Sequence, residues 1–214
     1  MSRRGPMTIS PSPIIERGKR DKEQRRQSLI DSATAVFAER GYDCATTREV
    51  AERANCAEGL IHRYFNGKRG LLLAILESRA TQVVEDFVGA LPDRDTLEEE
   101  IEKVILWHLD TMWERRDFMR VAVSQAAIDS EIGRTINEGI HNERVRLTKE
   151  KLDRHKRSGR IRSGVELEAI AQTITGIGFA LGFSFQVSLG QDRGIARSIA
   201  IEAAATLSRG ICRR

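Results

Sequence analysis

The sequence predicts an all-α protein. Apolar residues recur at intervals of three or four over most of the chain, which is the period of an amphipathic helix. No run of alternating β-branched residues lies between turn residues, so no strand is expected. Breaking residues at Gly41, Pro92, Gly164 and Gly190 divide the chain into segments of helical length.

The N-terminal residues 1–20 differ from the rest of the chain. They carry three of the four prolines and five basic residues without an apolar period, a composition typical of a disordered arm. Such an arm either reaches into a neighbouring minor groove or has no role, and both alternatives stay open. A first helix is expected over 21–40, because an apolar face runs from Leu29 to Phe37.

Two short helices joined by a tight turn are expected next. Thr46 and Glu49 have the spacing of a capping box, in which each side chain bonds the other residue's backbone N–H. Asn55 lies where the first short helix must end, and asparagine tolerates the left-handed backbone of such a corner. A second short helix is expected from Glu58 to about Tyr64. This arrangement is a helix-turn-helix, whose second helix enters the DNA major groove.

The remaining two-thirds of the chain also has helical periodicity. One part of it, residues 169–190, is uncharged and about long enough to span a bilayer. Six polar side chains recur through this part and would be costly in hydrocarbon, so a helix buried in a soluble assembly explains it better than a membrane span. The further helices are expected at 68–90, 97–112, 117–128, 131–157, 165–189 and 192–211, with a loop at 157–164.

Charge is distributed unevenly along the chain. Residues 1–70 hold fourteen Lys and Arg against nine Asp and Glu, whereas the remainder holds twenty-one against twenty-two. A basic end on a near-neutral body indicates that the first third meets a polyanion, although a solvated charged surface is the alternative. The three cysteines have no metal-ligand spacing, and no apolar signal segment begins the chain, so we expect reduced thiols in a cytoplasm.

A set of short motifs lies between Arg26 and Leu73. Together these motifs resemble the DNA-binding domain of the tetracycline-repressor (TetR) family of bacterial transcription regulators. Three departures from the family pattern are Asn55-Cys56-Ala57 in place of Gly-Val-Ser, His62 in place of an aromatic residue, and Arg69 in place of an acidic residue. The motifs that carry the resemblance are Ala35-x-Phe37, Gly41-Tyr42, Thr46-Thr47-Arg48-x-x-Ala51, Gly59, Tyr64-Phe65 and Lys68-x-x-Leu71.

The resemblance implies a division of the chain into three parts. An arm over 1–20 would precede a helix-turn-helix domain over 21–67 and a ligand-binding and dimerisation domain over 68–214. In the family, the last two long helices of each subunit pack against those of a second subunit. The interface of a homodimer is therefore expected in 165–211, and the small residues placed there are Gly176, Gly178 and Gly182.

The resemblance also assigns DNA contacts. Thr47, Tyr64 and Lys68 match positions that hold the DNA backbone, while Arg48 could bond a guanine edge. The alternative for Tyr64 is packing alone, and the alternative for Arg63 is a solvated charge. The residues expected to face the groove are Arg48, Glu58, Gly59, Leu60, His62 and Arg63.

A ligand pocket is expected in the larger domain. Pockets are mostly apolar with a few polar groups, although an aromatic and methionine stripe at helical spacing is more often core packing. The candidate residues are Trp107, His108, Met112, Trp113, Phe118, Met119, Gln125, Phe179, Phe183 and Phe185.

These observations predict a homodimeric transcription regulator that binds double-stranded DNA and an unknown small-molecule effector. It would be a repressor released from a palindromic operator, without a membrane contact. An enzyme is the first alternative, but the four histidines lack metal spacing and no nucleophile or phosphate-binding motif occurs, so no catalytic residue, metal site or cofactor is expected. A DNA-bending protein is the second alternative, but this function leaves the near-neutral helical body unexplained.

Overall fold

The computed structural model describes residues 13–213, with side chains from Arg20 onward. In this part of the chain the regular structure is helical, apart from one backbone bridge between Ile161 and Cys212, so the all-α prediction is confirmed. The helices are α1 (Pro13–Arg40), α2 (Thr47–Arg53), α3 (Gly59–Phe65), α4 (Lys68–Ala90), α5 (Leu97–Glu114), α6 (Arg116–Ile128), α7 (Ser130–Ile136), η1 (Asn137–His141), α8 (Asn142–Arg157), α9 (Leu167–Phe179), η2 (Ala180–Ser188) and α10 (Arg193–Ile211).

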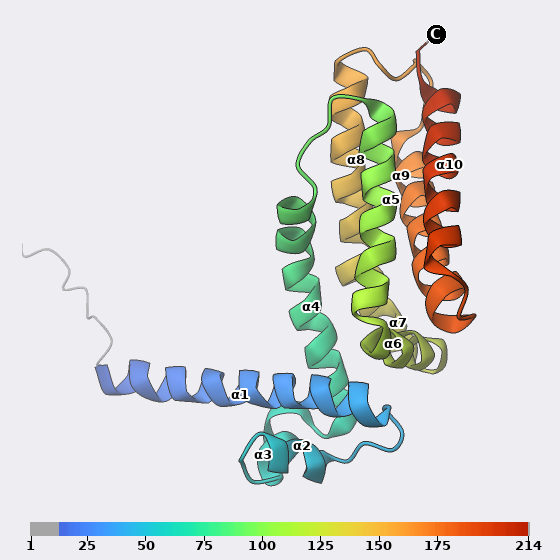
Figure 1. Ribbon diagram of the computed structural model, residues 1–214. Coiled ribbons are helices and arrows are strands. Elements are labelled where there is room, and N and C mark those ends of the chain that lie inside the picture. Colours follow the sequence, from blue (N-terminus) through green and yellow to red (C-terminus); the bar gives the residue numbers. More distant parts are fainter. Residues whose placement is uncertain (1–12, 214) are drawn as a thin grey trace, which may run out of the picture.

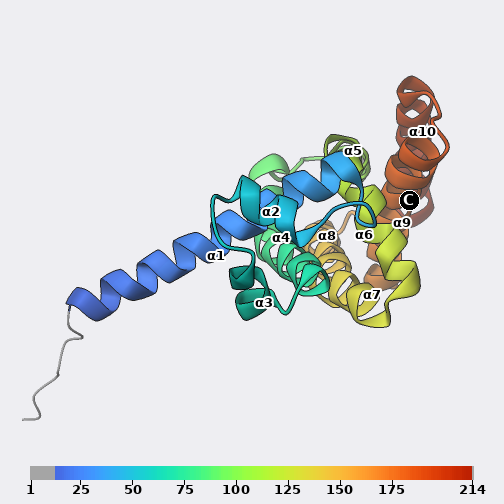
Figure 2. The ribbon, with the colours of Figure 1, turned by 90° about the horizontal axis from the view of Figure 1, so that it is seen from below.

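The helices form two connected groups. We call α1 to α3 with the first turns of α4 the head, and the remaining helices the body. Helices α5, α8, α9 and α10 stand side by side in the body, while α1 runs crosswise below α4 with only its last turns under α8 and α5, and α4 connects the two groups (Figure 1). Seen from below, α2 and α3 lie against α1 and the start of α4 (Figure 2).

Helix α1 begins earlier than the sequence predicts. The arm expected over 1–20 is wrong for residues 13–20, because the helix already begins at Pro13. Proline suits the first helical position, where its missing N–H costs nothing, and the Glu, Lys and Arg residues that follow are good helix formers. The part of the arm over 1–12 lies outside the described residues.

The head is built on a small apolar core that continues into the body. Leu29, Phe37 and Leu71 are buried there with apolar residues of α2 and α3. Phe118 of α6 and Ile132 of α7 belong to the same cluster. The head and the body therefore share one core at their junction, and helices α6 and α7 form the body's side of it.

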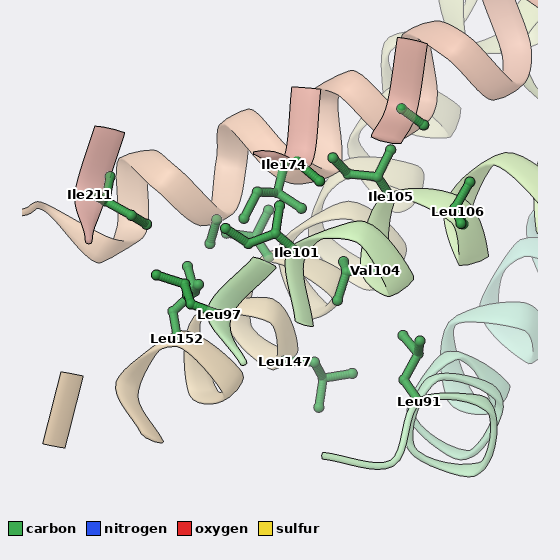
Figure 3. Close-up of a cluster of buried hydrophobic side chains, with 14 of the residues drawn as sticks. Leu91, Leu97, Ile101, Val104, Ile105, Leu106, Leu147, Leu152, Ile174 and Ile211 are labelled. Carbon is green, nitrogen blue, oxygen red and sulfur yellow. The ribbon is translucent and has the colours of Figure 1, made fainter. Parts of the chain in front are cut away.

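A second core lies between the long helices of the body. Ile101 and Ile105 of α5 face Ile174 of α9 in this cluster, and Leu147 and Leu152 come from α8 (Figure 3). Ile101, Ile105, Ile174 and Leu152 are each 1% exposed or less. Because burying such side chains contributes about 1.5–3 kcal/mol each, this core holds the four body helices together.

Two of the predicted long helices contain a π-helical stretch. The helix expected over 131–157 is divided into α7, η1 and α8, and the one expected over 165–189 into α9 and η2. The segment Leu167–Ser188 is apolar and long enough to cross a membrane by length and composition, but half of its most apolar window is buried inside the structure. That burial is typical of a core helix.

The glycines expected at the dimer interface have another role. A Cβ on Gly178 would meet the Cβ of His108 at 2.5 Å, and one on Gly182 would meet the Cα of Leu109 at 3.0 Å. Both glycines therefore let α9 and η2 approach α5 of the same subunit. The close helix approach is confirmed, but the assignment of Gly178 and Gly182 to a dimer interface is wrong. Gly176 is exposed, and a Cβ on it would meet no atom within 4 Å.

Candidate functional site

The first helix of the helix-turn-helix is fixed by its caps. Thr46 accepts a hydrogen bond from the backbone N–H of Glu49 at 3.2 Å, and the Glu49 carboxylate accepts one from the backbone N–H of Thr46 at 2.9 Å. The predicted capping box is confirmed. Asn55 follows the helix with a φ of 50°, which is the left-handed conformation expected at the corner. Local sequence signals thus set the position of α2.

Helix α3 presents a polar face beside α2. Its buried residues are Ile61 and Phe65, which anchor it on the head core. Gly59, His62 and Arg63 are exposed, as predicted for residues that face a groove. Leu60 differs from them because it packs partly against the head core. Arg48 and Glu58, which were also predicted to face the groove, are exposed as well.

Two of the predicted DNA contacts bind each other. The Thr47 hydroxyl donates a hydrogen bond to the Glu58 carboxylate at 2.5 Å, which joins α2 to the residue before α3. Arg48 is close by, and its Nε donates to Glu52 at 2.9 Å along the exposed face of α2. The Thr47–Glu58 bond holds the two helices of the motif in a defined relation, and both pairs must rearrange if Thr47 or Arg48 contacts DNA.

Tyr64 and Lys68 lie at the end of α3 and the start of α4. Tyr64 is half-buried and makes an edge contact with Phe65, with the ring centroids 6.2 Å apart. The Lys68 Nζ donates to the carbonyl oxygens of Tyr42 at 2.7 Å, Asp43 at 3.2 Å and Ala45 at 3.0 Å. Because all three ammonium donors are used, Lys68 holds the loop between α1 and α2. Its predicted phosphate contact stays a prediction, and these hydrogen bonds would have to rearrange for it to form.

A cavity of about 330 Å³ lies in the body. Its walls come from α4, α5, α6, α7, η1, α8 and α9, and its volume is in the range of small-molecule sites. Of the residues predicted to contact a ligand, those that line it are His108, Met112, Phe118, Met119 and Phe179.

The other ligand candidates pack elsewhere. Trp107 makes an edge contact with Phe87 at 5.1 Å between ring centroids, behind the cavity wall. Trp113 packs against the cluster of Met112, Phe183 and Val187 and contacts two guanidinium groups through its ring. For these residues the core-packing alternative is correct. The remaining candidates outside the lining are Gln125, Phe183 and Phe185.

His108 is buried at the cavity wall and uncharged. Its Nδ1 lies 2.8 Å from the carbonyl oxygen of Val104, which only accepts, so Nδ1 carries the proton. Burial, reinforced by the charge of Arg144, lowers the pKa of the imidazole to about 3. The imidazole therefore offers the unprotonated Nε2 as an acceptor, and this atom has no partner among the described groups.

Three arginines at the cavity were not predicted from the sequence. Arg79, Arg115 and Arg144 all line it. A signal was present for Arg144, because it lies four residues after Ile140 and three before Leu147, on the apolar seam of its helix. A charged residue on such a stripe indicates a buried polar function.

Two helices that line the cavity also belong to the head core. Helix α4 begins in the head, and its Leu76 is part of both the head core and the cavity wall. Phe118 and Ala122 of α6 are likewise in both. A molecule that moved these side chains would therefore act on the packing between the head and the body.

Comparison with known proteins agrees with this arrangement. The sequence model of the family described as bacterial regulatory proteins, tetR family, matches residues 29–75. The chain is 30% identical over 130 residues to the uncharacterized HTH-type transcriptional regulator TtgW of Pseudomonas putida, covering 60% of this chain and 89% of that protein. It is 26% identical over 160 residues to the fatty acid metabolism regulator protein of Bacillus subtilis, covering 73% of this chain and 81% of that protein.

A solved structure shows the same fold. The crystal structure of the transcriptional regulator FadR from Bacillus subtilis, in complex with stearoyl-CoA, superposes with a TM-score of 0.68 at 21% identity. The match covers 87% of this chain and 99% of that one. With its helix-turn-helix and its helical body, the chain belongs to the TetR family of bacterial transcription regulators.

Proposed function

We propose that the protein is a ligand-responsive repressor of the cytoplasm, which a small molecule in the body cavity releases from a palindromic operator. The observation that carries this proposal is the position of Phe118, whose side chain belongs both to the cavity wall and to the core shared with the head. A ligand that favours one packing of Phe118 changes the orientation of the head. A coupling of about 1–3 kcal/mol would change operator occupancy about 5- to 150-fold.

The relatives support a small-molecule effector. The Bacillus subtilis FadR structure holds stearoyl-CoA, and that protein shares the fold of this chain. The cavity of this chain has walls from the same helices that reach its head, so a ligand there would be linked to DNA binding. By linkage, operator DNA must weaken effector binding by the same factor by which the effector weakens DNA binding.

We infer that the protein is a homodimer through the exposed face of its last helices. Ile195 and Ile199 lie one turn apart on α10 and are 54% and 41% exposed, and Leu189 before α10 is 68% exposed. Gathered apolar exposure of this kind is typical of an interaction site. Two copies joined there would present two recognition helices to successive major grooves.

The dimer is tested by sedimentation at micromolar concentration. The wild-type chain should sediment as a dimer, and Ile199→Glu should give monomers because it places a charge in the apolar interface. Ile128→Glu is the matched control, since Ile128 is an 81% exposed isoleucine on α6, away from α10. A monomeric wild type, or equal effects of the two variants, would remove this interface.

The repressor function is tested by selecting operators from random duplex DNA. The bound pool should converge on one palindrome with half-sites about one helical turn apart. A pool without a consensus would indicate a DNA-bending protein, and no bound pool at all would contradict DNA binding. A reporter placed behind the selected palindrome should then be repressed by the protein, whereas increased expression would contradict a repressor.

A further inference from the structure

The cavity wall is rich in positive charge. Arg79, Arg115 and Arg144 all line it, and among the described lining residues none is an aspartate or a glutamate. Asp86 lies near the three arginines and binds Arg115 at 2.6 Å, and Asp31 lies near Arg79. The group thus has more positive than negative charge in a partly buried place, where charge is weakly screened.

Arg144 is the most buried of these arginines. This residue lies at the cavity wall and is 8% exposed. Its Nε has no hydrogen-bond partner among the described groups. The guanidinium lies over the ring of Trp107, 5.3 Å from the ring centroid. Burial lowers the pKa of Arg144 to about 10, so the group still carries its charge at neutral pH. A buried charge without a paired anion is costly.

A second unpaired donor faces the same cavity. Thr175 of α9 lines it, is 2% exposed, and its hydroxyl has no partner among the described groups. His108 offers only an acceptor at Nε2, as shown above, so it does not suit an anion. The rest of the lining is largely apolar, with Met112 and Phe118 among its members.

We propose that the effector is an amphipathic carboxylate, whose carboxylate binds Arg144 and Thr175 and whose apolar body lies against Met112 and Phe118. The proposal rests on the function proposed above and names the chemical class of its effector. A guanidinium binds a carboxylate through two parallel hydrogen bonds, which satisfies the unpaired donor of Arg144. The apolar body replaces water along the remaining wall, which adds affinity.

The test is calorimetric titration of the full chain with three probes of equal chain length. Decanoate carries the carboxylate, 1-decanol lacks the charge, and decanoyl-CoA presents its anionic groups on a bulky carrier. Decanoate should bind about 10- to 100-fold more tightly than 1-decanol, as expected for charge-assisted hydrogen bonds. Equal binding of decanoate and 1-decanol would overturn the proposal, as would binding of decanoyl-CoA alone.

Variants of α8 locate the anion. Arg144→Met should remove the preference for decanoate over 1-decanol, and Arg144→Lys should retain part of it. Arg146→Met is the matched control, because Arg146 lies on the same helix with its side chain exposed and paired to Glu143 and Glu150. An unchanged preference in Arg144→Met would overturn the proposal.

The ligand-free protein provides a second readout. Arg144→Met should raise the melting temperature without ligand, because it removes an unpaired buried charge and keeps a flexible side chain over Trp107. A lower melting temperature would show that Arg144 is structural.

Operator binding without any probe separates the two proposals. A chain that binds its palindrome but not decanoate contradicts only the carboxylate, and one that binds decanoate but no DNA contradicts only the repressor.

Discussion

Arg69 binds Asp129 through two parallel hydrogen bonds, from Nε to Oδ2 at 2.6 Å and from Nη2 to Oδ1 at 3.0 Å. Arg69 lies in the first turn of α4, in the head, while Asp129 caps α7 in the body by accepting from the backbone N–H of Glu131 and of Ile132. The pair therefore joins the head to the body beside their shared core. It uses the position at which the TetR family usually has an acidic residue.

The Arg69–Asp129 pair makes the stability of the folded protein depend on pH. The Arg69 guanidinium lowers the pKa of Asp129 from its ordinary 3.8 to about 2. A carboxylate whose pKa is lower in the folded than in the unfolded state stabilises the protein at pH values above its unfolded pKa. This contribution is lost as the pH falls from about 4 to 2. Asp129→Asn should therefore be less stable than wild type at pH 6, and the difference should shrink at pH 3. Urea unfolding at both pH values measures it. A difference that is constant with pH would contradict the ion pair.

Arg48 is expected to read a base. Its side chain is exposed on α2 and its Nε binds Glu52, so it can turn toward a guanine edge at little cost. Arg48→Ala should weaken binding to the preferred operator about 10- to 100-fold and relax selectivity at one base pair. Arg53→Ala is the control, because Arg53 on the same helix binds Glu39 of α1. Gel shifts with operators substituted at single base pairs measure the effect. Equal losses on all sequences would show that Arg48 does not read a base.

Lys68 is expected to stabilise the head. Removal of its ammonium leaves three carbonyl oxygens without their charged donor, so Lys68→Met should lower the free energy of unfolding by about 2–3 kcal/mol. Lys103→Met is the control, because Lys103 is on the surface of α5 in a weak pair with Glu102. Urea denaturation separates the variants. If Lys68→Met unfolded like wild type and changed only the salt dependence of DNA binding, a phosphate contact would be the better assignment.

The glycines of α9 should respond to substitution in opposite directions. Gly178→Ala places a methyl group 2.5 Å from the Cβ of His108 and should destabilise the protein by about 1–3 kcal/mol. Gly176→Ala meets no atom within 4 Å and should stabilise the helix by about 0.5–1 kcal/mol. Thermal melts of the two variants compare them directly. A neutral Gly178→Ala would show that α9 does not lie this close to α5.

Local signals in the sequence predict much of the head. The capping residues Thr46 and Glu49 and the corner residue Asn55 act within a few positions along the chain, so their effect can be read from spacing alone. The ends of α4 are also predicted, because a glycine precedes Lys68 and Pro92 follows the helix. The role of Lys68 cannot be predicted in this way. The carbonyl oxygens that it binds lie in a loop more than twenty residues earlier, and only folding brings them together.

Features that depend on which helices meet are harder to predict. The apolar and small residues of α9 indicate close packing, but periodicity cannot show whether the facing helix belongs to the same subunit. The stripe from His108 to Phe118 does predict part of the cavity wall. The arginines of the cavity wall were not predicted, because a charged side chain lowers the apolar signal of its own helix. Arg144 nevertheless lies on the apolar seam of its helix.

The π-helical stretch η1 sets the direction in which Arg144 points. Asn137–His141 lies between α7 and α8 without interrupting the helical run, and a π turn holds one residue more than an α turn. If the same residues formed a regular α-helix, the extra residue would no longer be absorbed by the wide turn, and α8 would be rotated by about 100° relative to α7, since each residue of an α-helix turns by that angle. Arg144 would then leave the cavity while both helices stayed intact. The ligand preference of this protein thus depends on the number of residues in one helical turn, as well as on which side chains follow it.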